Sequence, residues 1–91
     1  MLDVLYRRQF KKDLKRVLKN KRYKQEMFQE VVDYLIKEEK LPPKYRDHAL
    51  SGDYIGYREC HIAPDWLLIY KIDHDGLVLV LTRTGSHSEL F

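Results

Sequence analysis

The sequence predicts an α+β domain in which two N-terminal helices pack on a small antiparallel sheet, in the order β-α-α-β-β-β. Two stretches with apolar residues at helical spacing follow a short alternating segment at the N-terminus. After Pro42 and Pro43, three short apolar runs are separated by turn-forming residues, the pattern of hairpin-linked strands. A chain of 91 residues has room for one hydrophobic core. We therefore expect a single domain spanning residues 1–91.

The first three predicted elements precede the prolines. Apolar and polar residues alternate from Leu2 to Tyr6, which predicts a short strand. From Phe10 to Leu18 the apolar residues recur at helical spacing with lysines and arginines outside the stripe, which predicts a basic amphipathic helix. A second helical stripe runs from Met27 to Leu35. We expect Pro42 and Pro43 to end this second helix, because proline lacks an N–H and restricts the residue before it to extended geometry.

The second half of the chain has the sequence pattern of a β-sheet. The segments GYRECHI, WLLIYKI and LVLVLTRT are rich in apolar and β-branched residues. Pro64 and Asp65 separate the first from the second, and the DHDG sequence from Asp73 to Gly76 separates the second from the third. We expect three consecutive antiparallel strands, with the two helices covering one face of the sheet.

Composition narrows the classes of protein to consider. With 44% hydrophobic and 34% charged residues, the chain has the balance of a folded domain and not of a disordered one. Cys60 is the only cysteine, so neither an internal disulfide nor a cysteine metal site is expected, and a reducing compartment is indicated. The apolar runs WLLIY and LVLVL are far too short to span a bilayer, and no signal segment opens the chain. We expect a cytoplasmic protein with no membrane contact.

The charges are unevenly distributed along the chain. Between Arg7 and Lys24 there are ten basic residues and one acid, Asp13, so this segment carries a net charge of 10 − 1 = +9, whereas the whole chain carries +3. Such a concentration is typical of a surface that meets a polyanion or an acidic protein segment, although a solvated helix face is the simpler explanation for a charge run alone. The basic residues of the predicted first helix are Lys11, Lys12, Lys15, Arg16 and Lys19.

Three residues able to do chemistry lie around one predicted hairpin turn. His61 ends a strand, Asp65 lies in the turn and Trp66 begins the next strand, so a short turn brings them within reach of one another. Each also has a structural explanation. His61 fits a half-buried strand position, Asp65 is a good turn former after Pro64, and an aromatic residue at a strand start usually fills the core.

The C-terminal segment RTGSHSELF is harder to explain by structure alone. Arg83 presents a fork of donors that matches phosphate oxygens, His87 carries an imidazole that can pass protons, and Phe91 offers a ring on which a base can stack. Together these groups describe a site for single-stranded nucleic acid, and RNA carries its own nucleophile in the 2′-hydroxyl, so no cofactor is expected. A zinc site built from the histidines with Asp65 lacks the ligand spacing typical of such sites.

A long motif covers the segment from Leu41 to the end. It reads DHxLxGxYxGYRECHIxPDWLLIY, followed by RTGSH. In this motif the chain resembles the YafQ-type toxins of bacterial toxin–antitoxin pairs, a branch of the RelE/ParE superfamily, and the resemblance extends over nearly all of its length. It implies a RelE-like fold and a metal-independent endoribonuclease that cuts messenger RNA in the A site of the 70S ribosome. It also implies a cognate antitoxin that blocks the enzyme.

The chemistry of the side chains suggests a hypothesis for the roles of individual residues in this cleavage. Arg83 would grip the scissile phosphate, His87 would protonate the leaving 5′-oxygen, and His61, oriented by Asp65, would take the proton from the 2′-hydroxyl, with the reverse assignment of acid and base left open. Phe91 and Trp66 would hold the bases, and His48 would help to position or polarise the substrate. Carried over position by position, the family's functional residues fall on His48, His61, Asp65, Trp66, Arg83, His87 and Phe91.

Two other functions fit the same fold. ParE-type relatives bind a protein and inhibit DNA gyrase, and a fold does not by itself determine function. The imidazoles, Arg83 and the terminal ring argue against that class, because a protein-binding inhibitor has no need of proton carriers. The second alternative is a non-catalytic RNA-binding module that uses the basic helix. In the ribonuclease interpretation this helix docks on ribosomal RNA, so that binding depends steeply on salt.

Overall fold

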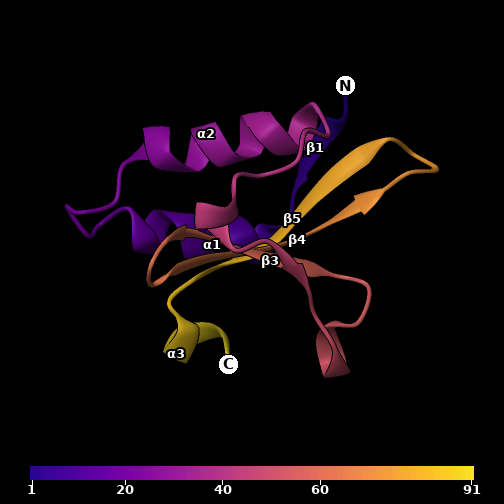
Figure 1. Ribbon diagram of the computed structural model, residues 1–91. Helices are drawn as coiled ribbons and strands as arrows, with labels where there is room; N and C mark the ends of the chain where they lie inside the picture. The colour runs from indigo at the N-terminus through magenta and orange to yellow at the C-terminus, as the bar shows by residue number, and fades with distance from the viewer.

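The computed structural model describes all residues from Met1 to Phe91 and has an α+β architecture, as the sequence predicts. A five-stranded sheet forms the centre, and two helices lie together on one of its faces, with a short C-terminal helix on the other (Figure 1). The elements are β1 (Asp3–Tyr6), α1 (Arg8–Val17), α2 (Gln25–Ile36), the 3-10 turn η1 (Pro43–Tyr45), β2 (His48–Ala49), the 3-10 turn η2 (Gly52–Tyr54), β3 (Arg58–Ala63), β4 (Trp66–Asp73), β5 (Val78–Gly85) and α3 (His87–Leu90).

The sheet differs from the predicted antiparallel one in the placement of its first strand. The strand order is β1-β5-β4-β3-β2, and β3, β4 and β5 form the predicted antiparallel meander. β1 pairs with β5 in parallel, so the sheet is mixed. β5 is the last strand of the meander and offers an open edge, whose backbone groups bond to β1 at both ends of the pairing, Asp3 N to Leu77 O and Arg7 N to Leu81 O. Alternating hydrophobicity predicts a strand but not its direction.

The second helix ends before the prolines. α2 stops at Ile36, and Glu38 adopts a left-handed backbone conformation with φ of 55°. The backbone N–H groups of Glu38 and Glu39 donate to the carbonyls of Leu35 and Tyr34, which satisfies the last turn of the helix. A local C-terminal cap therefore ends α2, and Pro42 and Pro43 lie in the following loop and the turn η1.

Both faces of β4 are buried, which explains its unbroken apolar run. Trp66, Leu68 and Tyr70 face α1 and α2 and belong to the main core. Leu67 and Ile69 point to the opposite face and pack with Leu90 of α3 in a small second core. The buried residues of the main core that α1, α2 and β5 contribute are Phe10, Val17, Phe28, Val31, Val32, Leu35, Leu79 and Leu81.

A β-bulge in β5 changes the direction of the side chains that follow it. Tyr70 pairs with Leu81, but the preceding residue, Ile69, pairs with Arg83, so Thr82 is an extra residue in β5. Strict alternation from Leu81 would place Arg83 on the helix-covered face. The bulge instead places Arg83 on the face of Ile69 and Thr84 on the face of Trp66, whose indole N–H donates to the Thr84 hydroxyl.

No helix of the structure is long and apolar enough to cross a membrane.

Candidate active site

The register of the sheet brings the candidate residues to one face. His48 pairs with Glu59, Glu59 with Ile69 and Ile69 with Arg83, so these four residues lie side by side across four strands. Directly paired residues share a face, and strands lie about 4.8 Å apart, which puts the Cα atoms of Glu59 and Arg83 roughly 10 Å from each other. His61, two residues after Glu59, points to the same face.

Glu59 links the two histidines of this face. Its carboxylate is almost completely buried, and Oε1 lies 3.5 Å from Nε2 of both His48 and His61. Nδ1 of His48 lies 2.7 Å from the carbonyl oxygen of Arg46. A carbonyl only accepts, so Nδ1 of His48 carries a hydrogen and Nε2 faces the carboxylate. Glu59 was not among the residues predicted from the sequence, although its spacing of two residues from His61 on a predicted strand places both on one face.

Asp65 contacts the C-terminal helix and not His61. Its Oδ1 accepts a hydrogen bond of 3.1 Å from the backbone N–H of His87. The N-terminus of α3 is also capped by Ser86, whose hydroxyl accepts from the backbone N–H of Glu89, while the Glu89 carboxylate accepts from the backbone N–H of Ser86. The predicted orientation of His61 by Asp65 is therefore replaced by two separate contacts, Glu59 with His61 and Asp65 with the backbone of His87.

The terminal ring belongs to an aromatic cluster. Phe91 is 55% exposed, and its ring centroid lies 5.3 Å from that of His87 and 5.9 Å from that of Tyr54, which it meets edge to face. Tyr54 meets Tyr57 in the same way. The preceding residue, Leu90, is buried against Leu67 and Ile69. The C-terminal segment is thus anchored to the sheet face, and the Phe91 ring stays open to solvent.

Trp66 presents no open ring face to a base in this structure. Its side chain is completely buried, its ring packs on Tyr23 with centroids 4.9 Å apart, and its indole N–H donates to Thr84. Side chains along β4 alternate between the two faces of the sheet, and Trp66 lies on the face covered by the helices. The structure therefore favours the core-filling explanation for Trp66 over the predicted substrate binding.

Arg83 is partly buried beside an acid of α1. Its side chain is 27% exposed, and its Nε lies 2.6 Å from Oδ2 of Asp13, whose side chain is completely buried. The hydrogen bond that Arg83 donates to Asp13 raises the pKa of the Arg83 guanidinium, against the opposing effect of burial. The Tyr54 side chain lies close enough to Arg83 to contribute to the same shift. Arg83 therefore carries a permanent positive charge next to the aromatic cluster.

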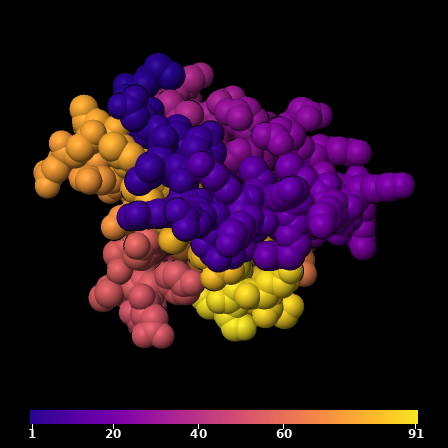
Figure 2. Space-filling model, turned by 180° about the vertical axis from the view of Figure 1, so that it is seen from behind, coloured from indigo at the N-terminus to yellow at the C-terminus, as the bar shows by residue number.

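The basic residues of α1 are exposed, but Arg16 pairs with two acids. Figure 2 shows the N-terminal half of the chain spread over one side of the molecule, with the C-terminal segment directly beside it. The guanidinium of Arg16 bonds to Asp13 and, through Nε, to Glu89 of α3 at 2.9 Å, so it joins α1 to α3. This structural contact makes Arg16 a poor candidate for the predicted substrate binding. The lysines that remain free to meet a polyanion are Lys11, Lys12 and Lys15 of α1 and Lys19 in the turn just after it.

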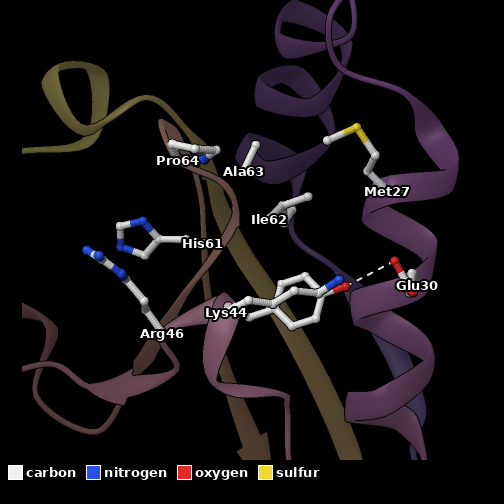
Figure 3. Close-up of a pocket in the computed structure, with 9 residues that line it drawn as sticks. Met27, Glu30, Lys44, Arg46, His61, Ile62, Ala63 and Pro64 are labelled. Atoms are coloured by element: carbon white, nitrogen blue, oxygen red, sulfur yellow. Dashed lines mark hydrogen bonds between the residues drawn. The ribbon is translucent and has the colours of Figure 1, made fainter.

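A hollow of about 560 Å³ lies beside the free edge of β3, between α2 and η1. Figure 3 shows Ile62 pointing toward α2, whereas His61 projects to the other side of β3, next to Arg46. Within the hollow, the Tyr45 hydroxyl donates to Glu30. His61 is the only predicted catalytic residue that lines it. The candidate active site is therefore the open sheet face beside α3 and not this hollow.

The ionisable groups of this face are not arranged as a metal centre. Nowhere in the structure do three or more histidine, cysteine, aspartate or glutamate side chains form a group able to hold a metal ion. The site as it stands offers imidazoles, a guanidinium and carboxylates that can bind a phosphate and move protons.

Comparison with known protein families shows to which family the chain belongs. The model of a family described as "Bacterial toxin of type II toxin-antitoxin system, YafQ" matches residues 2–91. The chain belongs to the YafQ toxin family. The resemblance noted in the motif thus extends over essentially the whole domain, and the RelE-like architecture predicted with it is that of solved YafQ structures.

Three similar proteins show how closely the chain matches known toxins. The mRNA interferase toxin YafQ of Escherichia coli K12 is 41% identical, with an alignment that covers 98% of this chain and 95% of that protein. A metal-bound toxin from Helicobacter pylori is 45% identical and superposes over 100% of both chains with a TM-score of 0.93. YafQ in the Escherichia coli DinJ-YafQ complex is 40% identical, covers 100% of this chain and 99% of that one, and has a TM-score of 0.83.

In this YafQ-family chain, the structure brings most of the predicted site residues to one region. The bulge, the short β2 strand and α3 each contribute to this arrangement, and none of them was predicted from the sequence. Trp66 and Arg16 serve structural contacts instead. The residues gathered on or beside the open sheet face are His48, Glu59, His61, Asp65, Arg83, His87 and Phe91.

Proposed function

We propose that this chain is an endoribonuclease toxin that cleaves messenger RNA on the ribosome and so inhibits translation. The observation that carries the proposal is the placement of Arg83 on the same sheet face as His61, beside the short helix that bears His87. A phosphate binder together with two proton carriers is what transfer of a phosphoryl group to a neighbouring hydroxyl requires. The name mRNA interferase, given to the Escherichia coli relative, supports this substrate.

The reaction needs only groups that the chain and the RNA supply. A base removes the proton of the 2′-hydroxyl, whose oxygen forms a bond to phosphorus. The bond from phosphorus to the 5′-oxygen breaks, and an acid donates a proton to that oxygen. The products are a 2′,3′-cyclic phosphate and a 5′-hydroxyl. Arg83 stabilises the charge that develops on the phosphoryl oxygens, because its guanidinium stays protonated and matches two oxygens at once.

The structure favours particular partners for the two proton carriers. His61 is assigned as the base, and the buried Glu59 carboxylate stabilises the imidazolium that forms when His61 takes the proton. His87 is assigned as the acid at the start of α3, where the backbone bond to Asp65 fixes its position. The reverse assignment of acid and base uses the same contacts. His48, which shares Glu59 with His61, positions or polarises the substrate.

The substrate is held by stacking and by charge. The exposed ring of Phe91 lies beside His87 and offers a face to an unpaired base, a contact worth about 1–3 kcal/mol per base. The free lysines of α1 contact ribosomal RNA phosphates, so binding weakens as salt rises. Because the C-terminal segment lies directly beside the N-terminal half, the docking surface adjoins the catalytic face (Figure 2).

The partner that silences this toxin is a separate antitoxin chain in the same cytoplasm. The DinJ-YafQ complex of Escherichia coli supports this assignment, since its YafQ is 40% identical to this chain over its full length. An acidic or amphipathic antitoxin segment is the kind of ligand that fits the lysines of α1.

Cleavage is proposed to need no metal or other cofactor. The Helicobacter pylori relative is described as metal-bound, so the proposal requires a direct test. In this chain the proton carriers and Arg83 already supply the acid, the base and the phosphate charge that a metal ion would otherwise provide.

The test is to add the purified chain to ribosomes programmed with a defined messenger, with and without chelator, and to map the new RNA ends. The proposal predicts cuts in the A-site codon that persist in chelator and leave a 2′,3′-cyclic phosphate. Intact messenger would overturn the ribonuclease function, and the same preparation would then be assayed for inhibition of gyrase supercoiling and for RNA binding without cleavage.

A further inference from the structure

Asp13 is the single acid in the strongly basic segment between Arg7 and Lys24, and its side chain is completely buried. An isolated buried charge is strongly unfavourable, so such a carboxylate requires donors. Its oxygens accept from Gln9 Nε2 at 3.0 Å, Arg16 Nη1 at 3.1 Å and the backbone N–H of Thr84 at 3.2 Å. They also accept from Arg83, through Nε at 2.6 Å and Nη2 at 3.3 Å.

This carboxylate occupies a gap at the edge of the sheet. β1 ends opposite Leu81, so the edge of β5 beyond that residue has no neighbouring strand. The backbone N–H of Thr84 would otherwise lack a partner, and Asp13 of α1 supplies the acceptor that a strand carbonyl would have given. The same carboxylate then reaches the side chain of Arg83, the neighbour of Thr84.

The two bonds to Arg83 use one edge of its guanidinium. An arginine has five N–H donors in a rigid fork, and Asp13 accepts from Nε and from one hydrogen of Nη2. Three N–H groups remain, and the side chain is 27% exposed. The ion pair therefore fixes the plane of the guanidinium and leaves donors for a phosphate.

We propose that Asp13 is a positioning residue for RNA cleavage, which holds Arg83 in the orientation that binds the scissile phosphate. The inference rests on the proposed function, because it concerns the phosphate contact of Arg83. An arginine held in place pays no ordering entropy when the transition state forms, whereas a free arginine has many rotamers to lose. Burial raises the pKa of Asp13, but the hydrogen bonds from Arg83, Gln9 and Thr84 outweigh it and lower that pKa overall, so the carboxylate stays charged at neutral pH.

The first test compares Asp13→Asn with Asp33→Asn in the ribosome cleavage assay. Asp33 is a matched control, since it accepts from the glutamine four residues earlier, as Asp13 does, but lies exposed on α2 and has no arginine partner. We expect Asp13→Asn to lower kcat by about 10²-fold, the loss that a misplacement of roughly 1 Å produces, with KM unchanged. Asp33→Asn should match the parent. An unchanged kcat in Asp13→Asn would overturn the proposal.

A double-substitution experiment separates positioning from general loss of structure. If Asp13 acts through Arg83, then adding Asp13→Asn to Arg83→Gln causes no further fall in kcat, although both variants lower the melting temperature. Independent, additive losses of kcat would contradict positioning.

A measurement on the parent chain covers the case in which Asp13→Asn does not fold. In the ¹⁵N spectrum at neutral pH, the Nε–H signal of Arg83, assigned by its loss in Arg83→Gln, should exchange with water much more slowly than that of the exposed Arg22. Equal exchange rates would overturn the inference. Absence of cleavage by the parent chain would overturn the proposed function instead, so the two failures are distinguishable.

Discussion

The backbone N–H of His87 donates a hydrogen bond of 3.1 Å to the Asp65 carboxylate, which joins the β3–β4 turn to the C-terminal helix. Asp65→Ala removes the acceptor, whereas Asp65→Asn keeps a carbonyl oxygen at that position. If Asp65 positions His87 through this bond, Asp65→Ala should lower the cleavage rate by about tenfold, the size expected for one lost hydrogen bond, and Asp65→Asn much less. Equal losses in single-turnover cleavage would show that the charge of Asp65 matters instead.

Glu59 connects His48 and His61 through one buried carboxylate. Glu59→Gln keeps the shape of the side chain but removes the charge that stabilises a protonated imidazole. We expect a fall in kcat that stays below the roughly 10²–10⁴-fold that a complete base contributes, because His61 itself remains. Single-turnover rates on programmed ribosomes measure it, with Glu26→Gln on the exposed start of α2 as the control. A parental rate in Glu59→Gln would remove Glu59 from the mechanism.

Trp66 is expected to matter for stability and not for catalysis. Trp66→Phe removes the indole N–H that bonds to Thr84 and leaves a small void in the main core. The free energy of unfolding should fall by about 1–3 kcal/mol, measured by urea denaturation. The cleavage rate per folded molecule should equal that of the parent. A large loss of rate at full stability would restore Trp66 as a substrate contact.

The exposed lysines of α1 should bind ribosomes without supporting the fold. Lys11→Glu combined with Lys15→Glu is expected to weaken ribosome binding and to reduce the slope of log K against log salt by about 0.7–0.9 for each phosphate that the variant no longer neutralises, at an unchanged melting temperature. The control is Lys37→Glu with Lys40→Glu, at exposed positions after α2. If both pairs bind alike, α1 is not the docking surface.

Acidification should destabilise the fold through two carboxyl groups. Hydrogen bonding to the Ser86 backbone and the neighbouring Arg16 lower the pKa of Glu89, and the donors around Asp13 lower its pKa despite burial. The ordinary pKa is 3.8 for Asp13 and 4.5 for Glu89, and each is lower in the folded chain, so the ionised carboxylates stabilise the fold at pH values above the ordinary pKa. This contribution is lost as the pH falls through the lowered pKa values. The free energy of unfolding should therefore decline below about pH 5.

The Glu89 part of this effect can be isolated. Glu89→Gln should show a shallower acid decline than the parent in urea titrations at several pH values, and Glu26→Gln should follow the parent curve. Identical curves for Glu89→Gln and the parent would contradict the assignment.

The elements of the fold that depend on a local sequence pattern were predictable. Helical spacing from Phe10 to Leu18 and from Met27 to Leu35 identified α1 and α2, and the turn residues around Pro64 and Gly76 identified the meander. The parallel pairing of β1 was not predictable, because it depends on which edge of the sheet is left open. Nor was the bulge at Thr82, which follows from pairing between strands and not from the local sequence.

The site was predictable in its chemistry but not in its contacts. His61, Arg83 and His87 were identified by what their groups can do, whereas the partners Glu59 and Asp13 act through tertiary contacts that spacing alone does not reveal. Trp66 is of a residue type typical of nucleic-acid sites, but in this structure its side chain lies in the core.

The central claim is that this sheet face cleaves RNA by acid–base chemistry with His87 as a proton carrier, and His87→Gln tests it most directly. The measurement is the single-turnover rate of cleavage in the A-site codon of programmed ribosomes, for the parent and the variant at equal ribosome occupancy. Acid–base catalysis by His87 predicts a rate lower by about 10²–10⁴-fold in His87→Gln, with ribosome affinity and melting temperature retained. Cleavage by the variant at the parental rate would contradict it.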